Sequence, residues 1–136
     1  MTGESNLPIL LQTMQPELHE SGFGFFSLPA DKATSLIPYA WGVFRESEGI
    51  TLILSSNIAD QHSLKIDPEW ALITLTVHSS LLAVGFLAAI SSALASSGIS
   101  LNAISAYYHD HLFVPWHQRF QALSVLNGLI NDHPGA

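Results

Sequence analysis

The sequence predicts an α+β fold of two interlocked halves, in which antiparallel sheets carry helices on one face. Only 11% of the 136 residues are charged whereas 48% are hydrophobic, so the chain must bury most of its apolar side chains. Residues 71–130 predict the order strand, helix, strand, strand, helix, which is the ferredoxin-like order without its last strand. A strand from the first half must complete that sheet, and we therefore expect the halves to interlock.

The boundary between the halves is predicted at the Asp67-Pro68 dipeptide, which is typical of a turn or break. We accordingly expect an N-terminal half over residues 1–66 and a C-terminal half over residues 67–136. A chain of this length is one domain, or two small halves that share a core.

Capping residues and composition predict the first helix and the first strand. Ser5 or Asn6 can cap a helix that has Pro8 in its first turn. The apolar face of this helix follows helical spacing through Leu7, Leu10, Leu11 and Met14. Residues 22–28 have the aromatic composition of a strand, which Pro29 ends.

The rest of the first half is predicted as a connection, a hairpin and a short helix. Residues 29–39 contain two prolines and predict a connection with at most one helical turn. Residues 40–45 and 50–54 predict two hairpin strands, because Gly49 between them can take a positive φ. Ser55 can cap the helix that follows.

The second half is more regular. Its predicted elements, strand, helix, strand, strand and helix, cover residues 71–77, 84–95, 101–108, 111–114 and 116–130. The apolar stripe of its first helix consists of Val84, Leu87, Ile90, Leu94 and Ala95. Gly98 suits the end of that helix. Tyr107 and Tyr108 are expected on opposite faces of a strand, with one of them packed inside.

Composition excludes several classes of function. A net charge of -7 repels phosphate backbones and anionic lipid, so we expect no nucleic-acid or membrane partner. With zero cysteines, disulfides and zinc–thiolate sites are impossible. Residues 1–11 have no positive charge before their apolar stretch, which does not fit a secretory signal, and we expect a cytoplasmic location. The apolar window of residues 81–95 is shorter than the ~20 residues of a membrane span.

Catalytic motifs are also missing from the sequence. It contains no GxSxG, P-loop or GxGxxG pattern and no paired-carboxylate motif. We therefore expect a protein that is not an enzyme and that has no cofactor.

One long segment is similar to a known family. Residues 73–115, ITLTVHSSLLAVGFLAAISSALASSGISLNAISAYYHDHLFVP, resemble the ACT-domain superfamily, and within it the small stand-alone bacterial proteins of two ACT-like halves in which a YYHDH-F-VP run recurs. Ordinary ACT domains carry a D-x-P-G loop between first strand and helix, a loop that often contributes to amino-acid binding. Val84-Gly85 takes the place of its Pro-Gly, whereas residues 78–80 (His-Ser-Ser) stand where the Asp is expected.

The loop before the first helix of the second half is the candidate binding site. A helix N-terminus leaves N–H groups unpaired and carries positive partial charge, so residues 79–85 can hold a carboxylate. Asn102, near the start of the next strand, can contact an amino group. The predicted ligand-binding residues are His78, Ser79, Ser80, Leu82, Val84, Gly85, Phe86 and Asn102. In this site His78 is expected to form a polar wall, and Leu82 and Phe86 are expected to form the apolar side.

The same residues also have a purely structural interpretation. Ser80 can be the helix N-cap, Gly85 can permit close packing, and Asn102 can satisfy a local backbone group. The chain would then be an oligomerisation module without a ligand.

Two histidines open a third alternative. His109 and His111 have the spacing of an H-x-H metal pair, to which His78 or His117 can add a ligand while Asp110 orients a ring. A metal-dependent hydrolase follows from that interpretation. Because the pair falls at an expected turn, exposed or mutually packed histidines are preferred, and no metal is assigned. A pH-responsive contact is a further option.

The function predicted from these observations is a non-enzymatic regulatory or sensor module that binds a small molecule, an amino acid above all. The groove is expected between the two halves or between subunits. Uncovered sheet edges and the low charge content predict a homodimer or a higher homo-oligomer.

Overall fold

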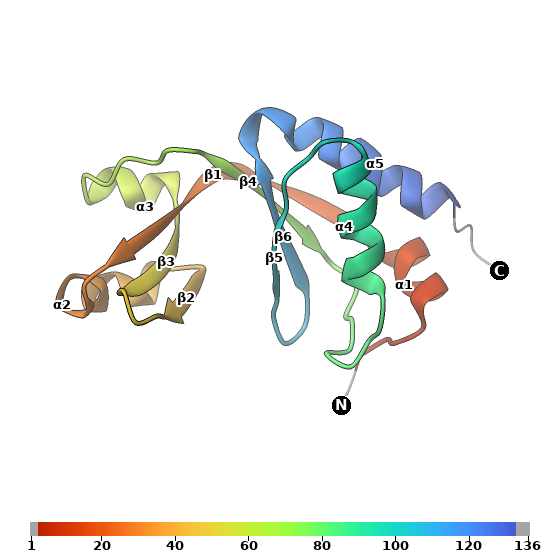
Figure 1. Ribbon diagram of the computed structural model, residues 1–136, viewed down its shortest axis with the longest axis horizontal. Helices are drawn as coiled ribbons and strands as arrows, with labels where there is room; N and C mark the ends of the chain where they lie inside the picture. Colours follow the sequence, from red (N-terminus) through yellow and green to blue (C-terminus); the bar gives the residue numbers. More distant parts are fainter. Residues whose placement is uncertain (1–2, 133–136) are drawn as a thin grey trace. The chain divides into compact units, whose positions relative to one another are not determined.

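The computed structural model describes residues 3–132, which form two compact units. One unit contains the chain up to His19 together with the chain from Ala71 onward, and the other contains Glu20–Trp70. Both belong to the α+β class, with antiparallel strands and helices, as predicted (Figure 1). The predicted boundary at residue 66 remains a proposal.

The unit that contains both ends of the chain has a four-stranded sheet with helices. Its strands hydrogen-bond in the order β1-β4-β6-β5, so a strand of the first half does complete the sheet. Its strands are the start of β1 (Pro16–Leu28), β4 (Trp70–Leu75), β5 (Asn102–Ser105) and β6 (Asp110–Pro115). Its helices are α1 (Leu7–Thr13), α4 (Phe86–Ser96), the 3₁₀ helix η2 (Trp116–Gln118) and α5 (Arg119–Asp132).

The unit of residues 20–70 repeats, on a smaller scale, the strand, helix, strand, strand, helix order that runs from β4 to α5. Its strand order is β2-β3-β1, and both pairs are antiparallel. It contains most of β1, α2 (Ala30–Ala33), the 3₁₀ helix η1 (Thr34–Tyr39), β2 (Gly42–Arg45), β3 (Ile50–Ser55) and α3 (Ser56–Gln61). The predicted hairpin is confirmed, and Gly49 in its loop has a φ of 157°.

Each unit has its own apolar core. In the larger unit the core lies between the sheet and helices α1, α4 and α5, which contact one another (Figure 1). Alternate residues of β4 and β6 supply the sheet side, as pleating requires: Ala71, Ile73, Leu75, Leu112 and Val114. In the smaller unit the core consists of Ala33, Leu36, Leu52 and Leu54.

The helix caps predicted at Asn6 and Ser55 are confirmed. The Asn6 side chain accepts a hydrogen bond from the Ile9 N–H at 3.0 Å and begins α1, which has Pro8 in its first turn. Ser55 caps α3 through the Ile58 N–H at 3.5 Å. Both caps are local contacts and follow directly from the sequence.

Residues 29–39 are more helical than expected. The sequence predicted at most one helical turn, but α2 and η1 together extend from Ala30 to Tyr39. Pro38 lies inside η1 and has no N–H to donate, so it removes one backbone hydrogen bond from this short 3₁₀ helix.

The first helix of the second half begins later than predicted. Val84 was assigned to its apolar stripe, yet α4 starts at Phe86 and Val84 is 84% exposed. Gly85 is the N-cap, and its left-handed φ of 89° keeps the preceding residues out of the helix. The helix ends as expected, with Gly98 at a φ of 71° just beyond it.

The strand predicted over residues 101–108 is shorter in the structure. β5 ends at Ser105, and the Ala106 N–H donates to the His109 carbonyl to close the hairpin. Tyr107 and Tyr108 therefore lie in the turn, and both are exposed instead of one being buried. No helix within residues 3–132 combines the length and the apolar character needed to cross a bilayer.

Candidate functional site

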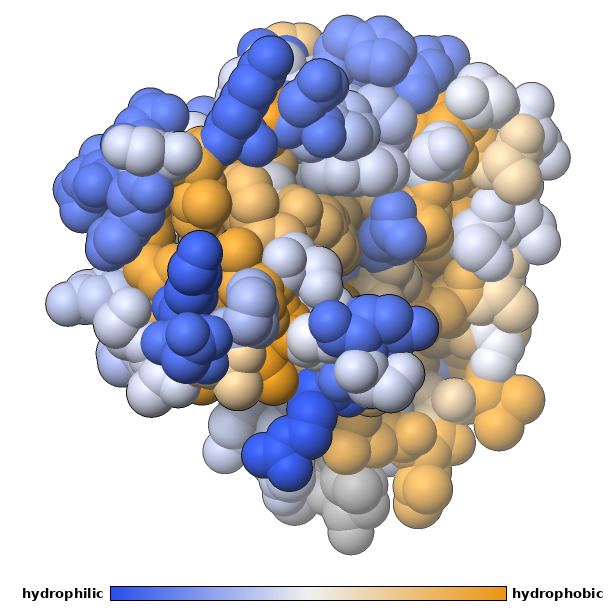
Figure 2. Space-filling view, turned by 60° about the vertical axis from the view of Figure 1, so that its left-hand side comes forward, coloured by the Kyte–Doolittle hydropathy of each residue, from blue (hydrophilic) through white to orange (hydrophobic). Residues whose placement is uncertain are grey.

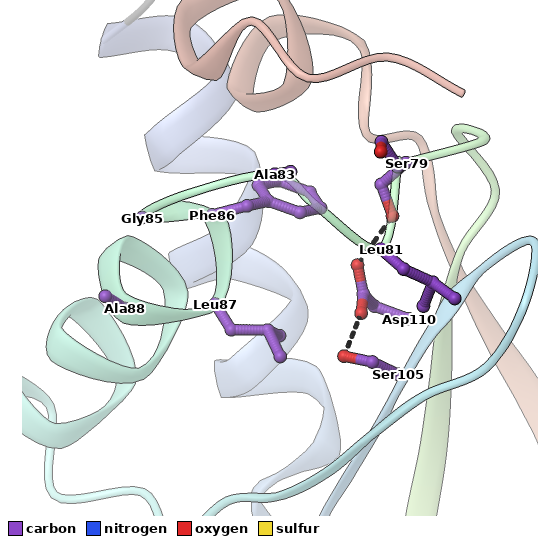
Figure 3. A pocket seen from close by; sticks show the side chains of 10 residues that line it. Ser79, Leu81, Ala83, Gly85, Phe86, Leu87, Ala88, Ser105 and Asp110 are labelled. Carbon is purple, nitrogen blue, oxygen red and sulfur yellow. Dashed lines mark hydrogen bonds between the residues drawn. The ribbon is translucent and has the colours of Figure 1, made fainter. Parts of the chain in front are cut away.

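A cavity of 140 Å³ lies at the start of α4 (Figure 3). Every lining residue belongs to the unit that contains both chain ends. They come from the loop before α4, from its first turn and from the β5–β6 hairpin: Ser79, Ser80, Leu81, Ala83, Gly85, Phe86, Leu87, Ala88, Ser105 and Asp110.

The Asp110 carboxylate is the charged group of this cavity. It is only 5% exposed, and each of its oxygens accepts a hydrogen bond from a hydroxyl (Figure 3). Ser79 Oγ donates to Oδ2 at 2.9 Å, and Ser105 Oγ donates to Oδ1 at 2.6 Å. Both partners are neutral, so they orient the carboxylate without balancing its charge. The cavity can therefore attract a cationic group.

The start of α4 supplies the opposite polarity. The first N–H groups of any α-helix lack carbonyl partners within the helix, and the helix dipole places positive partial charge there. At α4 the N-cap is Gly85, which has no side chain that could satisfy them. The first backbone bond of the helix is the one from the Ala89 N–H to the Gly85 carbonyl. This end of the cavity suits an anionic group.

Ser80 organises the loop and does not cap the helix. Its Oγ accepts from the Leu82 N–H at 3.1 Å, and its carbonyl accepts from the Ala83 N–H at 3.0 Å. The helix begins several residues later, so the interpretation of Ser80 as the helix N-cap was wrong.

The structure brings half of the predicted ligand-binding residues together around the cavity. Those four are Ser79, Ser80, Gly85 and Phe86. The other four do not line it. Leu82 and Val84 point to solvent, with exposures of 72% and 84%. Asn102 pairs with Phe113 in the β5–β6 register, far along the hairpin from the pair of Ser105 and Asp110.

His78 precedes the loop but lies outside the cavity lining. Its ring contacts that of Tyr108, with 5.0 Å between the centroids. Its Nε2 atom is buried and has no hydrogen-bond partner in the part of the chain that the structure describes.

Sequence reasoning missed Ser105 and Asp110 as cavity residues. The signal was present, because a tight hairpin after residue 105 brings its two strand ends together, and the register pairs Ser105 with Asp110. The prediction extended the strand to residue 108, and this concealed the pairing.

The neighbouring histidines form a separate cluster on the sheet face away from the core. The rings of His109 and His111 pack edge to face with centroids 6.5 Å apart. His109 Nδ1 donates to the Val77 carbonyl at 3.2 Å. Thr74 Oγ1 contacts His111 Nδ1 at 2.9 Å and His19 Nε2 at 2.8 Å. Within residues 3–132 no three metal-ligating side chains are grouped as a metal site requires.

Comparison with protein families gives two matches to ACT domains, one over residues 2–69 and one over residues 65–128. The comparison with curated proteins gave no match.

Solved structures with the same fold include a Vibrio cholerae protein of unknown function, described as a possible transport protein. It is 45% identical, with a TM-score of 0.76, over 88% of this chain and 92% of that one. An Agrobacterium tumefaciens protein is 17% identical, with a TM-score of 0.61, over 85% of this chain and 87% of that one. The ligand-free regulatory subunit of Thermus thermophilus aspartate kinase is 10% identical, with a TM-score of 0.63, over 86% of this chain and 97% of that one. The last two likenesses concern the fold alone.

ACT domains are regulatory rather than catalytic, and they generally bind small ligands. The two family matches together span almost the whole sequence, and the order of elements in both units agrees with them. The chain therefore belongs to the ACT domain family.

Proposed function

We propose that this protein is a non-enzymatic regulatory module that binds a free amino acid in the cavity beside α4. One observation supports the proposal above all: a helix start capped only by Gly85 and the buried carboxylate of Asp110 share one small cavity. An amino acid carries a carboxylate and an ammonium group on one carbon, so it matches both ends of the cavity.

The two charges of the ligand have different partners in this proposal. The carboxylate accepts hydrogen bonds from N–H groups in the first turn of α4, aided by the helix dipole. The ammonium group donates to Asp110, whose hydroxyl partners already orient its oxygens. We assign the amino contact to Asp110 instead of the predicted Asn102, because Asn102 does not line the cavity. A simple anion fits less well, because Asp110 would repel it.

The size of the cavity limits the ligand. Its 140 Å³ is less than half of the roughly 300 Å³ at which pockets for drug-sized ligands begin. Leu81, Ala83 and Phe86 add apolar walls. We therefore propose a small amino acid with an apolar or absent side chain.

Regulation would follow from a difference in affinity between two states of the loop. A ligand shifts an equilibrium only as far as it binds the two states differently. Bonds from the helix start and from Asp110 to one ligand join the loop, α4 and the hairpin. The bound form is then the more ordered one.

The cytoplasmic location expected from the sequence stays a prediction.

We also propose that the protein assembles as a homo-oligomer. Large apolar side chains reach the surface, as the orange areas of Figure 2 show. In the unit of residues 20–70 the outermost strand, β2, exposes 44% of Val43 and 71% of Phe44. Apolar surface next to an unpaired strand edge favours association with a second copy.

Titration calorimetry with the twenty amino acids tests the proposed ligand. At least one small amino acid should bind, and Asp110→Asn should weaken it by roughly 10- to 100-fold, as expected for a lost hydrogen bond to a charged group. Asp60→Asn, a change on α3 at a residue that does not line the cavity, should bind normally. If no amino acid binds the wild-type protein, the module without a ligand is the better description.

A further inference from the structure

The loop of the candidate site is hydrogen-bonded to the N-terminal segment of the chain. We call residues 3–6 the strap. The Glu4 N–H donates to the His78 carbonyl and the Ser80 N–H donates to the Glu4 carbonyl, both at 2.8 Å. These two bonds form an isolated parallel bridge between Glu4 and Ser79. Residues about 75 positions apart in the sequence are thus joined at the cavity wall.

Gly3 allows the strap to lie directly against the loop. Its φ of 101° is one that side-chain-bearing residues rarely adopt. A Cβ atom there would lie 2.8 Å from the Ser80 nitrogen, 2.9 Å from the Ser79 carbonyl carbon and 3.1 Å from His78 Cδ2. The first two are backbone atoms, so the clash is relieved only by moving the strap or the loop.

The other end of the strap is anchored in the core. Asn6 caps α1, and Leu10 of that helix is fully buried. α1 packs against both α4 and α5. Leu7 also approaches the loop, because its Cδ2 atom lies 3.4 Å from the position of a Cβ on Gly85. The strap therefore connects the loop to a fixed helix.

The loop itself has few constraints of its own. Within it the backbone is held by the two bonds to Ser80, from the N–H groups of Leu82 and Ala83. The side chains of Leu82 and Val84 are exposed and add little packing. Segments with few buried contacts open easily, so contacts from outside the loop decide how well it is ordered.

We propose that the strap is a positioning element, which holds residues 78–85 in the conformation that forms the cavity before any ligand arrives. It acts through the loop and does not touch the cavity, since none of residues 3–6 lines it. Its effect on affinity rests on the proposed function, because a loop that the strap already restrains loses less conformational freedom on binding. Its effect on the order of the loop in the ligand-free protein does not depend on the proposed function.

Hydrogen exchange of the ligand-free protein tests the strap directly. In Gly3→Ala the amide of Ser80 and those of the following loop residues should exchange about 5- to 30-fold faster than in the wild type. Gly128→Ala is the matched control, because a Cβ on Gly128, in α5, meets nothing within 4 Å. Unchanged loop exchange in Gly3→Ala would overturn the proposal.

A second variant covers the case in which Gly3→Ala lowers global stability. Deleting residues 1–4 removes both strap bonds but leaves the Asn6 cap of α1 in place. The loop amides should again exchange faster, while amides of β4 and β6 keep their protection. Equal acceleration in the loop and in those strands would mean general unfolding, and this too would overturn the proposal.

Affinity measurements on the strap variants distinguish a failure of the strap proposal from a failure of the proposed function. Both strap variants should bind the amino acid found by calorimetry about 5- to 30-fold more weakly. Normal affinity despite faster loop exchange would overturn the positioning role. Failure of the wild type to bind any amino acid refutes the proposed function, whereas the exchange measurements still decide whether the strap orders the loop.

Discussion

Thr74 links two histidines through a single hydroxyl group. Its Oγ1 lies 2.8 Å from His19 Nε2 and 2.9 Å from His111 Nδ1. A hydroxyl has one proton and two lone pairs, so Thr74 can accept a hydrogen bond from each ring or donate to one ring and accept from the other. The hydroxyl thus joins His19 of β1 to His111 of β6 through β4.

This cluster makes stability depend on pH. Burial, then the charges of His109 and His19, lower the pKa of His111 below 6.5, against an opposing contribution from Asp110. The unfolded chain therefore takes up this proton at a higher pH than the folded protein does. Stability should fall as pH drops below 6.5, and this fall should end below the folded pKa.

Thermal unfolding between pH 8 and pH 5 measures this effect. The melting temperature of His111→Gln should fall less steeply with pH than that of the wild type. His117→Gln, at an exposed position of η2, serves as the control and should keep the wild-type slope. Identical slopes for all three proteins would contradict the assignment to His111.

At the residue scale, sequence reasoning succeeds where the partner is close in the chain. Asn6 and Ser55 could be predicted as caps because the N–H group that each one binds lies only three residues further along the chain. Asp110 was not predicted as a site residue, because one of its partners, Ser79, is 31 residues away. Such a contact depends on strand order and register, which side-chain types alone do not specify.

At the scale of elements, periodicity gave the order of the strands and α-helices in the second half correctly. It misplaced their ends. Val84 has the spacing of the α4 stripe, but spacing does not report that Gly85 takes a left-handed conformation. The ends matter for function here, because the cavity is lined by the loop before α4, the first residues of that helix, the last residue of β5 and the first residue of β6.

The N-cap of α1 offers a test at this scale. Asn6→Ala removes the acceptor for the Ile9 N–H and should lower the free energy of unfolding by about 1 kcal/mol. Asn127→Ala, at an exposed position within α5, removes the same side chain without a cap and should change stability by less than ~0.5 kcal/mol. Urea denaturation of the two variants provides the comparison, and equal effects would contradict the role of the cap.

At the scale of the whole molecule, the low charge content that predicted a packed fold also leaves apolar surface uncovered. The fold class and the ACT family were predicted correctly, because they depend on element order and on the long run at residues 73–115. The side chains that remain exposed could not be predicted, because exposure depends on which elements end up at an edge. Phe44 and Phe120 are both exposed, the first on edge strand β2 and the second on α5.

These two phenylalanines provide a matched test of self-association. If copies of the chain join through the β2 edge, Phe44→Lys should reduce the mass of the assembly, because it places a charge where apolar surface and strand edge meet. Phe120→Lys introduces the same charge on a helix and should leave the assembly unchanged. Light scattering coupled to size-exclusion chromatography measures the mass over a range of concentrations. A wild-type protein that stays monomeric throughout, or a Phe120→Lys variant that alone dissociates, would contradict assembly through β2.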